Sequence, residues 1–353
     1  MLKRLHRWLG LLLVAPFVVI CLSGSLLLFK SDYLSMAYPQ LKPDAGQPLD
    51  SSLALERISK DFSADTISYL RLADEQYPYV QLITKRDHRY YFNINAELVV
   101  IMSDSSPWVW LSHLHGNWLA GKNGKAINGF LALTVLFITI IGVLLIAKEF
   151  EWRKVFRGFK GEQQPLKRSF FRHYGLGVLS LPALLLFTVT AVMFIYRSEI
   201  LKLTDSHKTE LARTVISTEQ VHSSSAMALS QLRFAEVLTA LSIYQPRLQF
   251  TFISFSHWNE GKLVVTAKQR TGLHPNGRYR LLVSLTNDGA VATIEGSKPS
   301  NLEQLLSSAF AIHAGYYWLE VTPLLYFING LVIIALCAVG IQLAIRRRQA
   351  KWP

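Results

Sequence analysis

The sequence predicts an α-helical membrane protein, with four transmembrane helices in two parallel repeats and two small α+β domains outside the membrane. Half of the 353 residues are hydrophobic and only 17% are charged, against about 25% in a typical soluble domain. The same landmarks also recur in both halves of the chain. Four apolar runs reach the length of about 20 residues that a bilayer requires: Trp8–Phe29, Ile127–Ala147, Leu176–Tyr196 and Leu324–Ile345.

The first run follows a basic start with Lys3 and Arg4 and contains the small residues Ser23–Ser25, as a signal peptide would. The run is long for a signal peptide, so we interpret it as a membrane span. Cys21 and Cys337 lie inside apolar runs, where we expect them to pack as small apolar side chains. Small residues of other kinds also interrupt the runs, as is common where membrane helices pack closely: Pro16, Gly24, Gly142, Pro182, Thr188, Thr190 and Gly340.

The charges between the runs predict the orientation. The loop from Lys148 to Arg172 carries eight basic and three acidic residues, and Arg346, Arg347 and Arg348 stand near the C-terminus. Lys and Arg accumulate on the cytoplasmic side of membrane proteins. We therefore expect a multi-pass protein of the bacterial inner membrane with both termini in the cytoplasm. The net charge of +13 then reflects topology and contacts with membrane lipids, and no nucleic-acid partner is expected.

The external segments read as small α+β domains. In the first, Ser51–Phe62 predicts a short helix, and the alternation over Tyr77–Ile101 predicts antiparallel strands. In the second, Ala226–Ile243 predicts a helix. Strands are expected after it at Leu248–Ser254, Lys262–Ala267, Tyr279–Leu285 and within Asn287–Gly296, where Asn287-Asp288-Gly289 indicates a hairpin turn. The predicted division is 1–29 (first span), 30–112 (periplasmic domain), 113–147 (outer histidine segment and second span), 148–172 (cytoplasmic loop), 173–196 (third span), 197–312 (periplasmic domain) and 313–353 (outer histidine segment, fourth span and basic tail).

Four landmarks recur in the same order in both halves, which predicts an internal duplication. Each half enters the membrane through H-x-x-x-G, at His6 and at His173, followed by an apolar run with a proline. Each half returns to the membrane after a histidine, which stands in His115-Gly116 in the first half and in His313-Ala-Gly315 in the second. An Asn-Gly pair follows near the start of each returning span, Asn128-Gly129 or Asn329-Gly330. Because both halves start on the same side, the repeat is parallel, with its axis along the membrane normal.

The repeat places His6 and His173 at equivalent positions on the cytoplasmic side, and His115 and His313 at equivalent positions on the outer side. A two-fold-like axis would bring each pair face to face. Two facing imidazoles are the axial ligands of a b-type haem, so the pattern predicts two haems. The alternative is that these histidines are ordinary interfacial residues. His113 is an alternative outer ligand, but His115 aligns better with His313, and residues two apart on a helix do not share a face.

Basic residues next to the predicted haems have two interpretations. Arg4, Arg7 and Arg172 flank the cytoplasmic histidines, where they could contact the haem propionates. Contacts with lipid headgroups and positive-inside sorting explain the same residues. No dinucleotide fingerprint, Walker loop or paired-cysteine motif is visible, and the catalytic residues remain unidentified. Quinol or a separate cytoplasmic donor must therefore supply any electrons.

Four segments, which together contain these histidines, resemble the PepSY-associated transmembrane family: Leu5–Phe29, Leu114–Ile146, Arg172–Phe194 and Ile312–Arg348. The family consists of bacterial inner-membrane proteins linked to iron uptake, and the resemblance extends to PepSY-like external domains. Some members resemble ferric-siderophore reductases with two b haems. By that resemblance His6, His115, His173 and His313 would bind haem iron, and a ferric siderophore or other iron chelate would be the substrate.

Two other functions compete with this one. The protein could be a non-enzymatic PepSY regulator or sensor that acts on a periplasmic protease or other partner. It could also be a transport component for the iron chelate, although the four spans contain few polar groups that could line a substrate path.

Overall fold

A computed structural model describes residues 1–148, 150–160, 162–204, 209–216, 228–270, 274–316 and 321–350. The chain divides into two compact units. The helical unit comprises Met1–Lys30, Trp110–Ile200 and Ala309–Pro353, and the sheet unit comprises Ser31–Val109 and Leu201–Ser308. Each unit therefore contains segments from both halves of the sequence.

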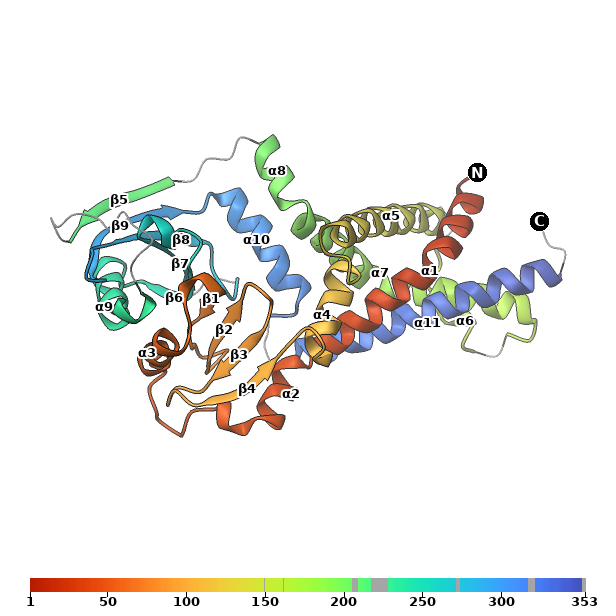
Figure 1. Ribbon diagram of the computed structural model, residues 1–353. Helices are drawn as coiled ribbons and strands as arrows, with labels where there is room; N and C mark the ends of the chain where they lie inside the picture. The colour runs from red at the N-terminus through yellow and green to blue at the C-terminus, as the bar shows by residue number, and fades with distance from the viewer. Residues whose placement is uncertain are drawn as a thin grey trace. The chain divides into compact units, whose positions relative to one another are not determined.

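The helical unit contains four long helices, α1 (Leu2–Leu27), α5 (Gly121–Ala147), α7 (Pro165–Ile195) and α11 (Thr322–Gln349) (Figure 1). Each is long and apolar enough to cross a membrane, which confirms the four predicted spans. Both α1 and α7 pack against α5 and α11. The order around the bundle is thus α1, α5, α7, α11, and α1 lies diagonally opposite α7.

Short helices accompany the four long ones. They are α4 (Pro107–Asn117), α6 (Trp152–Arg157), α8 (Arg197–Leu203) and α10 (Asn301–His313). Helix α4 ends because Trp118 and Leu119 adopt positive φ angles of 53° and 59°, which a right-handed helix excludes. His115 and His313 thus lie on helices of their own, separate from α5 and α11, which the sequence did not predict.

The sheet unit is built on one antiparallel sheet of nine strands in the order β4-β3-β2-β1-β6-β7-β8-β9-β5. Strands β1 and β6 join the contributions of the two external segments, with Leu70 opposite Ile253. The strands are β1 (Ile67–Arg71), β2 (Val80–Thr84), β3 (Arg89–Phe92), β4 (Leu98–Met102), β5 (Thr209–Val215), β6 (Leu248–Ser254), β7 (Lys262–Gln269), β8 (Tyr279–Leu285) and β9 (Val291–Lys298).

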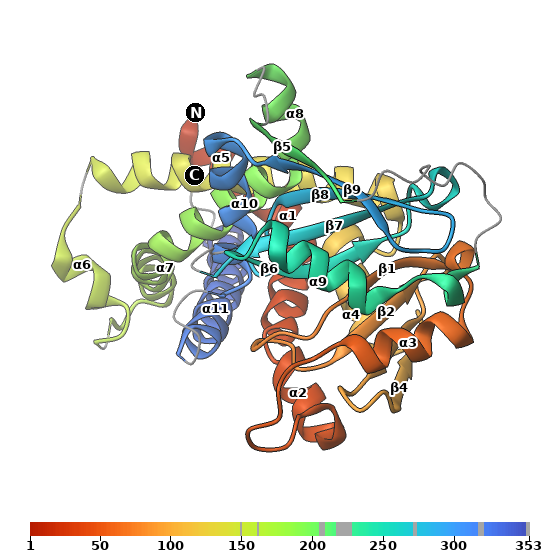
Figure 2. The ribbon, with the colours of Figure 1, turned by 90° about the vertical axis from the view of Figure 1, so that its left-hand side faces the viewer.

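Helices α3 (Ser52–Asp61) and α9 (Phe234–Tyr244) lie side by side on one face of this sheet (Figure 2). Leu55 of α3 and Val237 of α9 belong to the same buried core as strand residues from both segments. On the β2–β4 part of the sheet, a second cluster joins Leu34 of α2 (Lys30–Ala37) and Leu41 of the 3₁₀-helix η1 (Pro39–Leu41) to strand tyrosines. The larger of the two clusters thus joins the two segments of the sheet unit in one core.

Most predicted elements of the sheet unit are confirmed. The bounds of β6 and β8 agree with the prediction, and Gly289 takes the left-handed conformation of the predicted turn, with φ of 81°. The helix predicted over Ala226–Ile243 begins outside the described residues, and α9 starts only at Phe234, after the 3₁₀-helix η3 (Leu229–Gln231). Strands β1 and β5 were not predicted.

Candidate functional site

Two histidines from diagonally opposite helices meet within the bundle. The ring centroids of His6 on α1 and His173 on α7 lie 6.2 Å apart, with an interplanar angle of 70°. His6 stands in the second turn of α1, and His173 stands in the third turn of α7. We call His6 and His173 the first pair.

A second pair forms from the two short helices. His115 of α4 and His313, the last residue of α10, have ring centroids 6.3 Å apart and an interplanar angle of 41°. Phe187 of α7 packs edge-on against His313, with centroids 5.7 Å apart. His115, not His113, therefore contacts His313. The Nδ1 atom of His113 instead lies 3.4 Å from the side-chain nitrogen of Asn117.

The hydrogen bonds at Nδ1 decide which ring nitrogen carries the lone pair that could bind a metal. The Nδ1–H of His6 donates to the carbonyl of Ile138, at 3.2 Å, and the Nδ1–H of His115 donates to the carbonyl of Ile20, at 3.1 Å. A carbonyl only accepts, so in both rings the lone pair is at Nε2. Histidines that bind metals typically donate their other ring nitrogen in this way. The buried Nδ1 of His173 lies near the carbonyl of Leu336 on α11 but forms no hydrogen bond of good geometry with the described residues.

Glycines stand where neighbouring helices face three of these rings. A Cβ added to Gly142 would lie 3.5 Å from Cε1 of His6, and one added to Gly340 would lie 3.4 Å from Cε1 of His173. A Cβ on Gly24 would approach Cε1 of His115 to 2.7 Å, which is closer than atoms can pack. The sequence identified all three only as helix-packing residues.

The donor set fits haem iron. A metal ion between two imidazoles lies about 2.0 Å from each nitrogen, which places the ring centroids about 6 Å apart, as in both pairs. Burial, followed by the proximity of His115, lowers the pKa of His313 to about 4, and burial also lowers the pKa of His115. Both imidazoles of the second pair are therefore neutral at physiological pH, as a ligand must be. Pairs of neutral imidazoles are the axial ligands of low-spin b haems.

The three arginines predicted to contact haem propionates, Arg4, Arg7 and Arg172, differ in their surroundings. The guanidinium of Arg7 stacks on the Trp8 ring, 5.7 Å from its centroid, and Nε of Arg172 donates to the Gly158 carbonyl at 3.1 Å. Arg4 is exposed, and its side chain forms no hydrogen bond or ion pair with the described residues.

Sequence reasoning missed one cation near the first pair. Arg347 interacts electrostatically with both Arg7 and His173. Arg347 follows Gly340 by seven residues, which places both on one face of α11. The seven-residue spacing from Gly340 could therefore have identified Arg347 as a cation near the first pair.

The Asn-Gly landmarks play different roles in the two halves. Asn128 donates its side-chain NH₂ to the carbonyl of His115 at 2.6 Å. In the second half Tyr326 donates to the carbonyl of Ile312, next to His313, at 2.8 Å, whereas the half-buried Asn329 donates to Leu325 of its own helix. The two Asn-Gly landmarks therefore make different contacts, and in the second half Tyr326 forms the hydrogen bond to the histidine helix.

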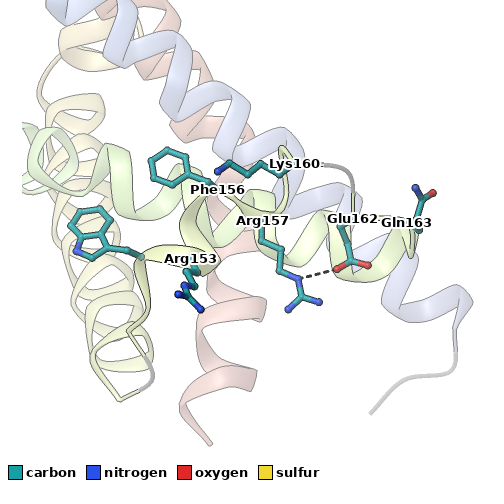
Figure 3. A pocket seen from close by; sticks show the side chains of 7 residues that line it. Arg153, Phe156, Arg157, Lys160, Glu162 and Gln163 are labelled. Carbon is teal, nitrogen blue, oxygen red and sulfur yellow. Dashed lines mark hydrogen bonds and ion pairs between the residues drawn. The ribbon is translucent and has the colours of Figure 1, made fainter.

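A shallow hollow lies along α6, which packs against α7. Arg157 donates to Glu162 there at 3.1 Å (Figure 3). Aromatic and basic side chains in this combination suit the headgroup region of a membrane. The hollow is lined by Trp152, Arg153, Phe156, Arg157, Lys160, Glu162 and Gln163.

Comparison with known proteins agrees with the resemblance read from the histidine segments. The family model for the PepSY-associated TM region matches residues 3–347, which include both histidine pairs. The chain belongs to the PepSY-associated transmembrane family. This PepSY-associated protein has four helices long and apolar enough to cross a membrane, together with one antiparallel sheet. No curated protein matches the chain.

Proposed function

We propose that this protein binds two b haems, one at each histidine pair, and works as an inner-membrane reductase of ferric siderophores. The observation that carries the proposal is the repeated geometry of the pairs. The centroid separations of 6.2 and 6.3 Å match the separation of about 6 Å expected for two imidazoles on one metal ion. Three of the four Nδ1 atoms also lie within hydrogen-bond distance of an oxygen, which leaves Nε2 for the iron.

His6 and His173 would hold one haem, and His115 and His313 would hold the other. Arg7 and Arg347 are the cations next to the first pair, so they are the best candidates for the propionates of that haem. When bound, haem b supplies a one-electron carrier at each site. The protein's own residues orient the rings, keep Nε2 unprotonated and exclude water.

The separation of the pairs supports electron delivery across a membrane. His115 contacts α1 at Ile20 and Ser23, which follow His6 by 14 and 17 residues. At 1.5 Å per residue this is about 21–26 Å along the helix, most of the hydrocarbon thickness of about 30 Å. One pair would then lie near each side of the bilayer.

We also propose that the two halves form a parallel repeat with both termini in the cytoplasm and the sheet unit in the periplasm. Equal spacings support the repeat. Gly340 follows Gly142 by 198 positions, and His313 follows His115 by the same number. The basic residues around Arg347 and along Lys148–Arg172 support the orientation. Quinol or a separate cytoplasmic protein would be the electron donor.

Reduction suits a function in iron release. Siderophores bind Fe(III) far more tightly than Fe(II), so an electron delivered to a ferric siderophore frees its iron. The substrate would bind on the periplasmic side, and the proposal leaves its chelating groups open.

An absorption spectrum of protein purified from haem-replete cells tests the function. We expect a Soret band, a sharp α-band after reduction, and two haems per chain by pyridine haemochrome assay. Reduced protein should be reoxidised by a ferric siderophore, with Fe(II) appearing in a chelator trap. Protein without a Soret band would contradict the proposal, and co-purification of a periplasmic protease with such protein would support the regulatory alternative.

A further inference from the structure

Two buried hydroxyl groups contact the second histidine pair. Ser23 Oγ of α1 lies 3.2 Å from Nδ1 of His115, and Thr190 Oγ1 of α7 lies 3.0 Å from Nδ1 of His313. Both side chains are almost completely buried. Each spanning helix of the diagonal pair thus contributes one hydroxyl to a histidine on another helix.

The proton of each hydroxyl is already used within its own helix. Ser23 Oγ donates to the carbonyl of Val19 at 2.8 Å, and Thr190 Oγ1 donates to the carbonyl of Leu186 at 2.6 Å. A hydroxyl has one hydrogen to donate and two lone pairs that accept. Towards the histidine each oxygen therefore acts as an acceptor, and the imidazole must carry its proton at Nδ1. At His115 this one N–H is shared between Ser23 Oγ and the carbonyl of Ile20, at 3.2 and 3.1 Å. The lone pair of each ring is consequently at Nε2.

In the described structure no hydroxyl lies at Nδ1 of either ring of the first pair, although His6, like His115, donates to a backbone carbonyl. His6 donates to the carbonyl of Ile138, and Nδ1 of His173 lies near the carbonyl of Leu336 without a hydrogen bond of good geometry to the described residues. Yet the two hydroxyls occupy matching places, since Ser23 follows His6 by 17 residues and Thr190 follows His173 by 17 residues. Each half of the sequence thus supplies one hydroxyl, and both hydroxyls contact the second histidine pair.

We propose that Ser23 and Thr190 are positioning residues that accept from Nδ1–H of His115 and His313, at His115 together with the Ile20 carbonyl, and orient Nε2 of each ring towards one iron. This inference rests on the proposed haem function. An acceptor at Nδ1–H makes the imidazole more basic and a stronger iron ligand. It therefore stabilises Fe(III) relative to Fe(II) and sets the potential of the second haem below the value it would have without the hydroxyls.

Substitution of the hydroxyls in the full-length, haem-loaded protein tests the inference. In Thr190→Val and Ser23→Ala we expect the midpoint potential of one haem to become more positive while the other stays unchanged, in a redox titration followed at the α-band. The low-spin EPR signal of the same haem should change its g-values. Retention of that haem should fall about tenfold or more, as for other outer contacts of metal ligands.

Matched variants separate a hydroxyl effect from a packing effect. Thr190→Ser and Ser23→Thr keep the hydroxyl and should retain the wild-type potential and spectrum. Thr188→Val removes a buried hydroxyl that donates only within α7, to Leu184 at 2.6 Å and more weakly to Leu185, and should leave both haems unchanged. Should Thr190→Val fail to fold, the smaller change in Ser23→Ala decides the question.

The outcomes separate the inference from the function beneath it. If wild-type protein binds haem, and the potentials and spectra of Thr190→Val and Ser23→Ala both equal those of Thr188→Val, the role of the hydroxyls is overturned. The haem function then stays intact. Wild-type protein without a Soret band would overturn both.

Discussion

The imidazole rings of His6 and His173 meet with their centroids 6.2 Å apart, although 167 positions separate them in the chain. Their helices touch the same two neighbours, α5 and α11, from opposite corners of the bundle. The rings therefore meet on the bundle axis, with Gly142 and Gly340 at the flanks. A contact between two imidazoles from opposite corners of the bundle favours a ligand site over a headgroup contact.

Removal of either member of the first pair should remove one haem. In His6→Ala or His173→Ala we expect the haem content to fall by half, because an iron that loses one axial imidazole is held by a single ligand. His113→Ala is the matched control, since the ring of His115 contacts His313. Pyridine haemochrome assays on the purified variants measure the content. A full complement of haem in both His6→Ala and His173→Ala would contradict the assignment of the first pair.

A methyl group at Gly24 should disturb the second pair. Its Cβ would lie 2.7 Å from Cε1 of His115, so the ring or helix α1 has to move. We expect Gly24→Ala to lose one haem or to broaden its EPR signal. Gly10→Ala on the same helix is the control, because a Cβ there has no neighbour within 4 Å. Equal spectra of the Gly24→Ala and Gly10→Ala proteins would argue against a rigid His115 position.

Neutralisation of the cations near the first pair should lower the potential of its haem. A positive charge favours Fe(II) over Fe(III), so Arg7→Gln and Arg347→Gln should each move one midpoint potential to a more negative value. The shift should shrink at high salt to the extent that these charges are exposed to solvent. Arg4→Gln serves as the control. A shift of the same size in all three variants would show a general surface-charge effect instead of a specific contact.

The junction of β1 and β6 should be necessary for the stability of the sheet unit. Leu70 and Ile253 face each other across it and are fully buried. Leu70→Ala leaves a cavity and should cost about 2–5 kcal/mol in the free energy of unfolding. Thermal unfolding followed by circular dichroism measures the loss, and Leu98→Ala, at an exposed position on β4, should change the melting temperature little. Similar melting temperatures for both variants would show that the two segments are stable without the junction.

The spans and most strands could be predicted because their signals are local. A run such as Ile127–Ala147 is apolar over the length of a bilayer, and Tyr279–Leu285 alternates over one strand. Strand β1 was missed because Ile67–Arg71 is short and its place in the sheet depends on pairing with β6, far along the chain. The break at Trp118 and Leu119 was missed because positive φ angles at such residues have no local signal.

The sequence by itself determined the number of membrane helices, the family and the four histidines worth examining, since length, hydropathy and repeated motifs are written along the chain. Only the tertiary structure decided which rings meet, because contact depends on how distant helices pack. It placed His115 and not His113 against His313, and it brought Ser23 and Thr190 to the second pair. Each of those contacts joins residues more than ninety positions apart, and no local pattern encodes such a distance.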